Sequence, residues 1–251
     1  MGNDSLIRSN TDTGLLKLIA AVCMVVDHVG QVFFANTPYY VVMRGIGRLA
    51  FPLFAYCMAV GCRHTRNIAL YALRILLLAI LVQPLYAEAM GLVALGGFDW
   101  KNHFLQPGLI FRHYYSGNLN ILFSLFLGIG LIWTLRDGHF YLTAPLALLC
   151  FILQEHLDYG VRGLLLMVMY YCLLERPLAS IIWTGLLMLH WGMPYLFSDG
   201  SMEYTWQIFA MLAMPLIYIP LHSRMRMPKF FFYAFYPAHL LVIYLIQYWG
   251  R

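Results

Sequence analysis

Charged residues are scarce in this sequence. Asp, Glu, Lys and Arg make up 11% of its 251 residues, whereas hydrophobic residues make up 62%. A soluble domain usually has about 25% charged and about 45–50% apolar residues. The interior of a soluble domain of this size cannot hide so much apolar surface, but a lipid bilayer can surround it. The composition therefore excludes an ordinary soluble domain and predicts an integral membrane protein.

Several functional signatures are also missing. The five cysteines form no C-x-x-C pair and the nine histidines show no zinc-ligand spacing, so neither a disulfide framework nor a metal site is expected. No glycine-rich phosphate loop is present. The net charge of +5 is scattered between apolar segments, which is typical of membrane orientation and does not favour nucleic-acid binding.

Apolar runs separated by polar breaks predict an all-α protein, a polytopic transmembrane helical bundle of about nine spans (about eight to ten). The first run, 14–34, is too long for the apolar part of a signal peptide and lacks an A-x-A site, so we expect a permanent span. We expect one membrane domain over 1–251, with a short tail at 1–13 and a long loop at 87–118. The expected spans are 14–34, 45–61, 69–86, 119–135, 140–154, 160–174, 177–196, 206–221 and 230–249.

The distribution of Lys and Arg predicts the orientation of this bundle. With a cytoplasmic N-terminus, the inner loops carry eight of these residues and the outer segments carry four. The best single signal is the cluster of Arg224, Arg226 and Lys229 before the last span. The 87–118 loop is then extracytoplasmic, either as a lid or binding loop or as a re-entrant or interfacial segment.

The first span contains the clearest functional signal, because an ionisable side chain at mid-span costs about 2.5–3.5 kcal/mol on translocon scales. Lys17 and His28 are eleven residues apart, which places them on one helix face and about 16 Å apart along the axis. Asp27 points about 100° away from His28, so we expect it to contact another helix.

The second span opens with two arginines, Arg44 and Arg48, that share one helix face across intervening glycines. In the predicted topology Arg48 lies at a depth similar to that of His28. A histidine base beside a fixed cation suits acyl transfer, because the histidine removes a proton while the guanidinium stabilises an oxyanion. The structural alternative is that the arginines anchor the end of a span and that His28 only packs.

Three further polar residues each have two possible interpretations. His239 lies near the middle of the last span beside Pro237, whose ring frees a backbone carbonyl; it is either a site residue or a packing residue. Asp158 is either a loop residue or part of a polar pocket. Arg74 lies near the inner end of its span, where it can reach the headgroups or serve a site.

Five blocks of sequence resemble the conjugative pilin acetylase (TraX) family. They are KLI through VDH (17–28), GRLAFPLF (47–54), GNLNILF (117–123), DYGVRGLLL (158–166) and FYPAHL (235–240). The resemblance implies transfer of acetyl from acetyl-CoA to the N-terminus of a pilin subunit during conjugation, at the outer face of a bacterial inner membrane.

A basic residue, ten residues and a histidine in the first span also resemble the membrane acyltransferase-3 group, in which this histidine is regarded as catalytic. By position, the resemblance implies His28 as base or acyl relay and Arg48 as a site cation. We also expect Asp27, which adjoins His28 in the sequence, to belong to the catalytic site. Lys17, Arg63 and Arg66 are expected to bind the phosphates of acetyl-CoA from inside, and no metal is expected. The second-tier site residues are Arg44, His239, Tyr236, Asn120 and Asp158.

Two alternatives remain open. The acceptor could be a hydroxyl of an envelope glycan or lipid instead of an amine. The protein could also be a non-enzymatic assembly factor, or a proton-coupled transporter in which Asp27, His28 and His239 form a proton relay. No pair of similar halves, which many transporters have, is found in the sequence.

Overall fold

The described residues are almost entirely helical in this computed structural model of the chain, which describes residues 9–10, 13–192, 205–221, 228 and 230–250. No strand occurs in this part of the chain, where β-pairing is limited to one isolated bridge between Leu119 and Leu157. The predicted all-α class is confirmed. In chain order the elements are α1 (Thr13–Phe33), α2 (Tyr39–Gly47), α3 (Ala50–His64), α4 (Ile68–Ala89), α5 (Trp100–His103), α6 (Pro107–Tyr114), α7 (Ile121–Arg136), α8 (Phe140–Ile152), η1 (Gln154–His156), α9 (Gly160–Cys172), α10 (Pro177–Gly192), η2 (Thr205–Leu212), α11 (Ala213–Tyr218) and α12 (Phe231–Trp249).

Helices long and apolar enough to cross a membrane account for much of the described chain, as the composition predicts. Four segments meet this criterion: Thr13–Phe33, Tyr39–His64, Ile68–Ala89 and Phe231–Trp249. Shorter apolar helices include α7, α8, α9 and the η2–α11 segment from Trp206. The predicted second span is interrupted, because α2 and α3 are separate helices that meet at Arg48 and Leu49.

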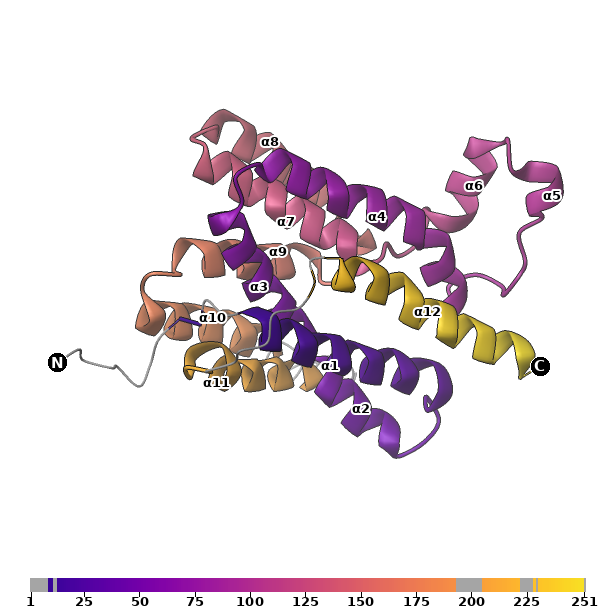
Figure 1. Ribbon diagram of the computed structural model, residues 1–251, viewed down its shortest axis with the longest axis horizontal. Helices are drawn as coiled ribbons and strands as arrows, with labels where there is room; N and C mark the ends of the chain where they lie inside the picture. The colour runs from indigo at the N-terminus through magenta and orange to yellow at the C-terminus, as the bar shows by residue number, and fades with distance from the viewer. Residues whose placement is uncertain (1–8, 11–12, 193–204, 222–227, 229, 251) are drawn as a thin grey trace.

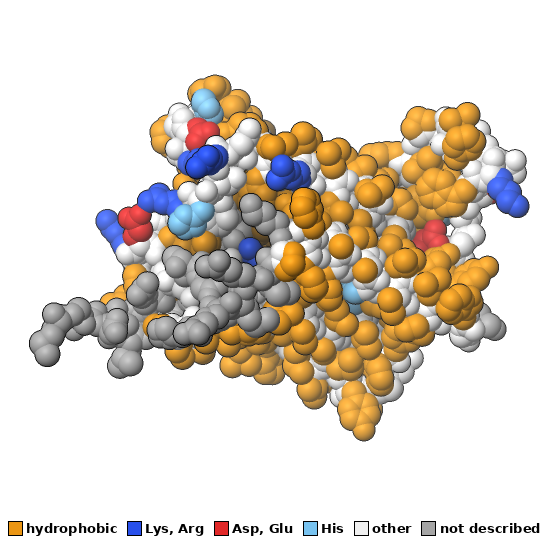
Figure 2. All heavy atoms as spheres, viewed as in Figure 1, with side chains coloured by type: hydrophobic (Ala, Val, Ile, Leu, Met, Phe, Trp, Pro, Cys, Tyr) orange, Lys and Arg blue, Asp and Glu red, His pale blue; other side chains and the backbone are white. Residues whose placement is uncertain are grey.

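The helices run lengthwise through the molecule, with α1, α4 and α12 pointing the same way in Figure 1. Each of the three begins toward the left of that view and ends toward the right, where α5 and α6 project beyond α4. On the face shown in Figure 2, hydrophobic side chains dominate the middle, and most charged side chains lie toward the two ends. This pattern is the one expected when the apolar middle faces lipid.

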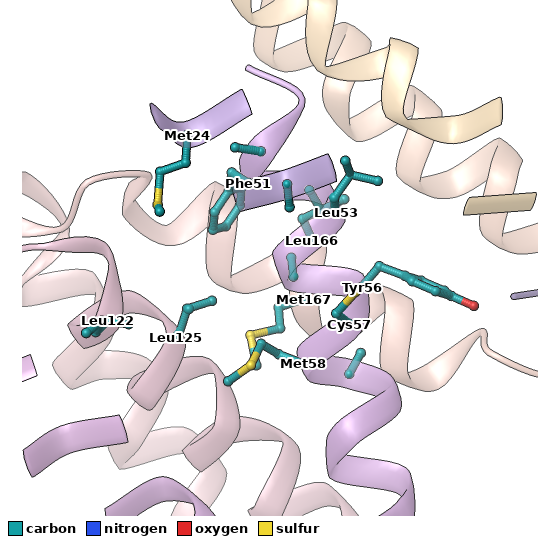
Figure 3. Close-up of a cluster of buried hydrophobic side chains, with 14 of the residues drawn as sticks. Met24, Phe51, Leu53, Tyr56, Cys57, Met58, Leu122, Leu125, Leu166 and Met167 are labelled. Carbon is teal, nitrogen blue, oxygen red and sulfur yellow. The ribbon is translucent and has the colours of Figure 1, made fainter. Parts of the chain in front are cut away.

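Helix α3 lies at the centre of the core, with eleven of its fifteen residues buried. Its side chains pack against α1, α7 and α9, as Figure 3 shows for the sulfur-containing and aliphatic side chains gathered around it. Tyr56 on this helix donates a hydrogen bond of 2.5 Å to the carbonyl of Asn10, which fixes Asn10 to the core. By contrast, α8 buries only Cys150, and its exposed apolar face suits contact with lipid.

The α1–α2 pair approaches closely at two glycines. A Cβ atom on Gly30 would lie 2.7 Å from the Cβ of Met43, and one on Gly47 would lie 2.0 Å from Oδ1 of Asp27. Both distances are far below van der Waals contact, so only glycine fits. Gly47 therefore lets the Asp27 carboxylate lie directly against the α2 backbone, as small residues commonly do between membrane helices.

Candidate functional site

Two histidines from opposite ends of the chain meet inside the bundle. His28, on α1, places its Nδ1 3.0 Å from Nε2 of His239, on α12. Their rings stack with centroids 5.1 Å apart and an interplanar angle of 20°. The other ring nitrogen of His239, Nδ1, lies 3.1 Å from the carbonyl oxygen of Phe235, one turn earlier on the same helix.

This chain of contacts determines which nitrogen of His28 carries the proton. A carbonyl oxygen only accepts, so Nδ1 of His239 donates to Phe235. In a neutral imidazole the second nitrogen is then an acceptor, so Nδ1 of His28 donates to Nε2 of His239. Nε2 of His28 keeps its lone pair and makes no hydrogen bond with any described residue. That nitrogen has the state required of a general base or nucleophile.

Asp27 joins α1 to the two arginines Arg44 and Arg48. Its side chain points away from His28 toward another helix, as helical geometry predicted. Its Oδ2 accepts a hydrogen bond of 2.7 Å from Nη1 of Arg44, and its Oδ1 lies 3.8 Å from Nη2 of Arg48. Gln31, one turn further along α1, also accepts from Arg44 at 3.1 Å. These contacts hold Arg44 firmly.

Arg48 is held more loosely than Arg44. Its Nη1 donates only a long bond of 3.4 Å to Oε1 of Gln207, and its buried Nε has no partner among the described residues. Nε2 of Gln207 and Oδ1 of Asp27 are likewise buried without a hydrogen-bond partner in this part of the chain. Such groups cost free energy unless a ligand or water pairs with them. The site therefore retains hydrogen-bonding capacity for a bound molecule.

These groups surround a cavity of about 220 Å³, called here the polar cavity. Its charged and ionisable lining residues are Asp27, His28, Arg44, Arg48 and Asp158. The remaining walls come from Gln31, Tyr40, Tyr86, Met90, Tyr159, Trp191, Trp206 and Gln207.

An aromatic cluster supports one wall of the polar cavity. Phe51 and Tyr159 stack with centroids 3.9 Å apart, and Trp191 meets both rings edge-on. Gly163 makes the stack possible, because a Cβ there would lie 2.8 Å from the Phe51 ring. The cluster holds the α9 end of the cavity, and with it Asp158, against α3.

Asp158 lies between η1 and α9, outside both helices. The residue as a whole is exposed, but desolvation of its carboxyl beside the cavity raises the pKa to about 6, although Arg48 nearby acts in the opposite direction. The sequence allowed Asp158 to be either a loop residue or part of a polar pocket. The structure shows that it is part of the pocket, because Asp158 lines the polar cavity.

A second, larger cavity of about 670 Å³ lies toward the beginnings of α1, α4 and α12 and is called here the apolar cavity. Aliphatic and aromatic side chains form most of its wall, together with Lys17 and Arg74. Met24 and Tyr236 line it as well. Each of these two lies close to one histidine in sequence, Met24 four residues before His28 and Tyr236 three residues before His239. The histidine pair thus stands about one helical turn beyond the apolar cavity, at the border of the polar one.

The predicted site residues separate into those that the structure brings together and those that it does not. Asp27, His28, Arg44, Arg48 and Asp158 share the polar cavity. His239 contacts His28 directly, while Lys17 and Tyr236 line the apolar cavity.

Arg63, Arg66 and Asn120 line neither cavity. Arg63 is exposed and pairs with Glu175. Asn120 is fully buried, where its side chain caps α7 by accepting from the Leu122 amide and donates to Gln83. Its role is to join α4 to α7.

Sequence reasoning missed Gln207, Trp191 and Trp206. Nothing in their local sequence separates them from other residues of apolar helices. They reach the cavity because η2 packs against α2 and α3 and α10 packs against η2 and α9. A metal site is not indicated either, since no three His, Cys, Asp or Glu side chains among the described residues lie close enough to share an ion.

Comparison with known proteins identifies relatives over nearly the whole chain. A family model described as TraX protein matches residues 12–247. The chain is also 26% identical, over 91% of its length and 92% of the relative, to the probable fimbrial assembly protein FimC of serogroup H1 from Dichelobacter nodosus. No solved structure matches the chain.

Proposed function

The chain belongs to the TraX family, and from that membership we propose that it is a membrane-embedded acyltransferase that moves acetyl from acetyl-CoA to the N-terminal amine of a pilin subunit. The observation that carries this proposal is the His28–His239 pair, which stands between two cavities and leaves Nε2 of His28 unprotonated and unpartnered among the described residues.

The chemistry follows from the positions of His28 and Arg48. Nε2 of His28 takes a proton from the acceptor amine as the amine attacks the thioester carbonyl. The C–N bond forms and the C–S bond breaks, and the CoA thiolate leaves with the proton returned by His28. Arg48, whose Nε has no partner in the described structure, stabilises the negative charge that develops on the carbonyl oxygen.

The two cavities suit substrates that arrive from opposite sides. In the proposed orientation the N-terminus is cytoplasmic and about nine spans cross a bacterial inner membrane, so the apolar cavity opens inward and the polar cavity outward. The donor extends from Lys17 to His28, which lie about 16 Å apart along α1. The acceptor enters the polar cavity, and residues 87–118 form an extracytoplasmic segment beside it. No acetylated carrier then needs to cross the membrane.

The family membership and the name of the relative support a pilus or fimbrial subunit as the acceptor. The polar cavity suits a chain terminus, because Asp27 and Asp158 can pair with an amine while Arg48 and Gln207 can donate to peptide carbonyls. A hydroxyl of an envelope glycan or lipid could use the same groups, so the assay must examine every envelope fraction.

A direct test compares membranes that carry the native protein with membranes that carry His28→Ala at matched expression. Both are incubated with isotopically labelled acetyl-CoA, and envelope proteins, glycans and lipids are examined by mass spectrometry. Label that requires His28 would establish the acyltransferase, and the labelled molecule would identify the acceptor. Equal label in both samples, with both proteins folded, would refute the proposal.

A second candidate is a membrane assembly factor that performs no chemistry. The observation that favours it is the name of the relative, which refers to fimbrial assembly and not to an enzyme. The two candidates differ in one phenotype. If the protein is an assembly factor, the His28→Ala variant would still support fimbriation or piliation, provided that the bundle folds. Neither the native protein nor the variant would transfer label.

A further inference from the structure

The apolar cavity contains two cations that no described residue neutralises. Lys17 projects from α1 and Arg74 from α4, and both belong to its lining. No acidic residue of the described part of the chain lines this cavity, and neither cation makes a hydrogen bond or ion pair with any described residue. Positive charges within apolar helices are costly and persist mainly where a partner, a headgroup or water receives them. Their shared cavity points to an anionic partner.

We infer that Lys17 and Arg74 bind the phosphate groups of a CoA thioester whose pantetheine arm lies in the apolar cavity; this inference rests on the proposed acyl transfer. The cavity volume of about 670 Å³ falls within the range of about 300–1,000 Å³ typical of small-molecule sites. Aliphatic walls suit the arm. A guanidinium binds phosphate through two parallel hydrogen bonds, and an ammonium adds a point charge.

The far end of the apolar cavity favours this occupant over a lipid tail. Tyr236 lines the cavity, and its hydroxyl is buried without a hydrogen-bond partner in the described part of the chain. The amides and thioester of an acylated pantetheine can bond to that hydroxyl, whereas the methyl end of a lipid chain leaves it unpaired. Tyr236 also packs edge-on against His239, so a thioester that reaches Tyr236 arrives beside the histidine pair.

Arg74 takes the place that the sequence assigned to Arg63 and Arg66. Arg63 is paired with Glu175 at the surface, and neither of these arginines lines the cavity. Arg74 and Lys17 come from different helices, α4 and α1, and no spacing in the sequence relates them.

The inference is tested by equilibrium binding of CoA and of pantetheine, which lacks phosphate, to the purified full-length protein in nanodiscs. Lys17→Ala and Arg74→Ala are each expected to weaken CoA binding roughly tenfold, the effect of losing one charge-assisted hydrogen bond. Pantetheine binding should not change. Arg176→Ala, which removes an exposed arginine away from the cavity, is the matched control and should leave both affinities unchanged.

Three outcomes would overturn the inference. Arg74→Ala could leave CoA affinity intact, or could weaken CoA and pantetheine equally, which would mean that Arg74 supports the fold and not the phosphates. The third is a tightly co-purifying anionic phospholipid that is lost with Arg74→Ala and is not displaced by CoA. In each case His28-dependent acetyl transfer by the native protein would leave the proposed function standing. Phosphate-dependent CoA binding without any transfer would instead support the site and refute the function.

Discussion

Nε2 of His239 lies 3.0 Å from Nδ1 of His28 and joins the first long helix of the chain to the last. Because the Phe235 carbonyl holds a proton on Nδ1 of His239, the contact orients the ring of His28 as well as packing it. The geometry resembles the general arrangement in which one group fixes the tautomer of a histidine that acts on substrate.

This relationship predicts that His239 is a positioning residue. His239→Leu removes the acceptor for the Nδ1 proton of His28, and kcat for acetyl transfer should fall on the order of 100-fold with little change in KM for acetyl-CoA. His239→Gln can present its amide oxygen to the same proton and should recover part of the rate. Steady-state kinetics of each variant in nanodiscs would measure kcat and KM separately. Equal losses of kcat in both variants would contradict a role of His239 in fixing the tautomer of His28.

The ion pair between Asp27 and Arg44 is expected to contribute to stability. The two side chains are mostly buried, and their charged atoms lie 2.7 Å apart. A double-mutant cycle with Asp27→Ala and Arg44→Ala should give a coupling free energy of about 1–3 kcal/mol in thermal or denaturant unfolding. The exposed pair of Arg63 and Glu175 serves as the control, with an expected coupling of about 0–1 kcal/mol. Equal coupling in the two cycles would argue against a structural role for Asp27.

Gly47 is predicted to be intolerant of even one added carbon. In Gly47→Ala the new Cβ would lie 2.0 Å from Oδ1 of Asp27, so α1 and α2 must separate and the carboxylate must move. We expect a loss of about 1–3 kcal/mol of stability together with reduced activity. Gly108→Ala, where no atom lies within 4 Å of the new Cβ, should be neutral or slightly stabilising. If both variants unfold at the same temperature, the close approach at Gly47 has no energetic role.

Much of the fold could be predicted from the apolar runs, because a helix that faces lipid must be apolar along its whole length. The limits of α1, predicted at 14–34 and found at Thr13–Phe33, show how directly hydropathy marks such a helix. The direction of Asp27 also followed from helical geometry alone. The break of the second span at Arg48 and Leu49 did not, because it depends on how α2 packs against α1 at Gly30 and Gly47.

The site was only partly predictable. His28 and Arg48 could be identified in the sequence because an ionisable side chain inside a membrane span costs free energy. Such a residue therefore usually has a functional or a structural role. Gln207 and Trp191 carry no such signal, since a glutamine or tryptophan in an apolar helix is common. Arg74 could be noticed in the sequence, but its relation to Lys17 depends on the contact between helices far apart in the chain.

Asp158 predicts a pH dependence of stability. Desolvation of its carboxyl raises the pKa from 3.8 to about 6. Between those values the folded chain holds one proton more than the unfolded chain, so stability falls as pH rises. Because Asp158 is an exposed residue, water screens part of this effect. The stability gained at low pH should therefore be well below the roughly 3 kcal/mol of an unscreened shift, and it is lost between about pH 4 and about pH 7. Thermal unfolding of the native protein and Asp158→Asn across this range should show the native protein losing stability relative to the variant, and a constant difference would contradict the assignment.

The proposed orientation can be tested with the native cysteines. All five are free, and Cys172 is the exposed one whereas the other four are buried. Cys172 ends α9, which the proposed topology places at the cytoplasmic side. A membrane-impermeant maleimide should therefore leave it unmodified in intact spheroplasts and modify it after permeabilisation.

Ser116, exposed beyond α6 and on the proposed outer side, provides the reciprocal position. In a Cys172→Ser background, Ser116→Cys should react in intact spheroplasts without permeabilisation, because the 87–118 segment then faces the periplasm. The two positions lie on opposite sides only if an odd number of crossings separates them, which α7, α8 and α9 supply in the nine-span arrangement. If both thiols react from outside, one of these short helices does not cross the membrane. If both are protected in intact spheroplasts, residues 87–118 do not face the periplasm and lie away from the acceptor.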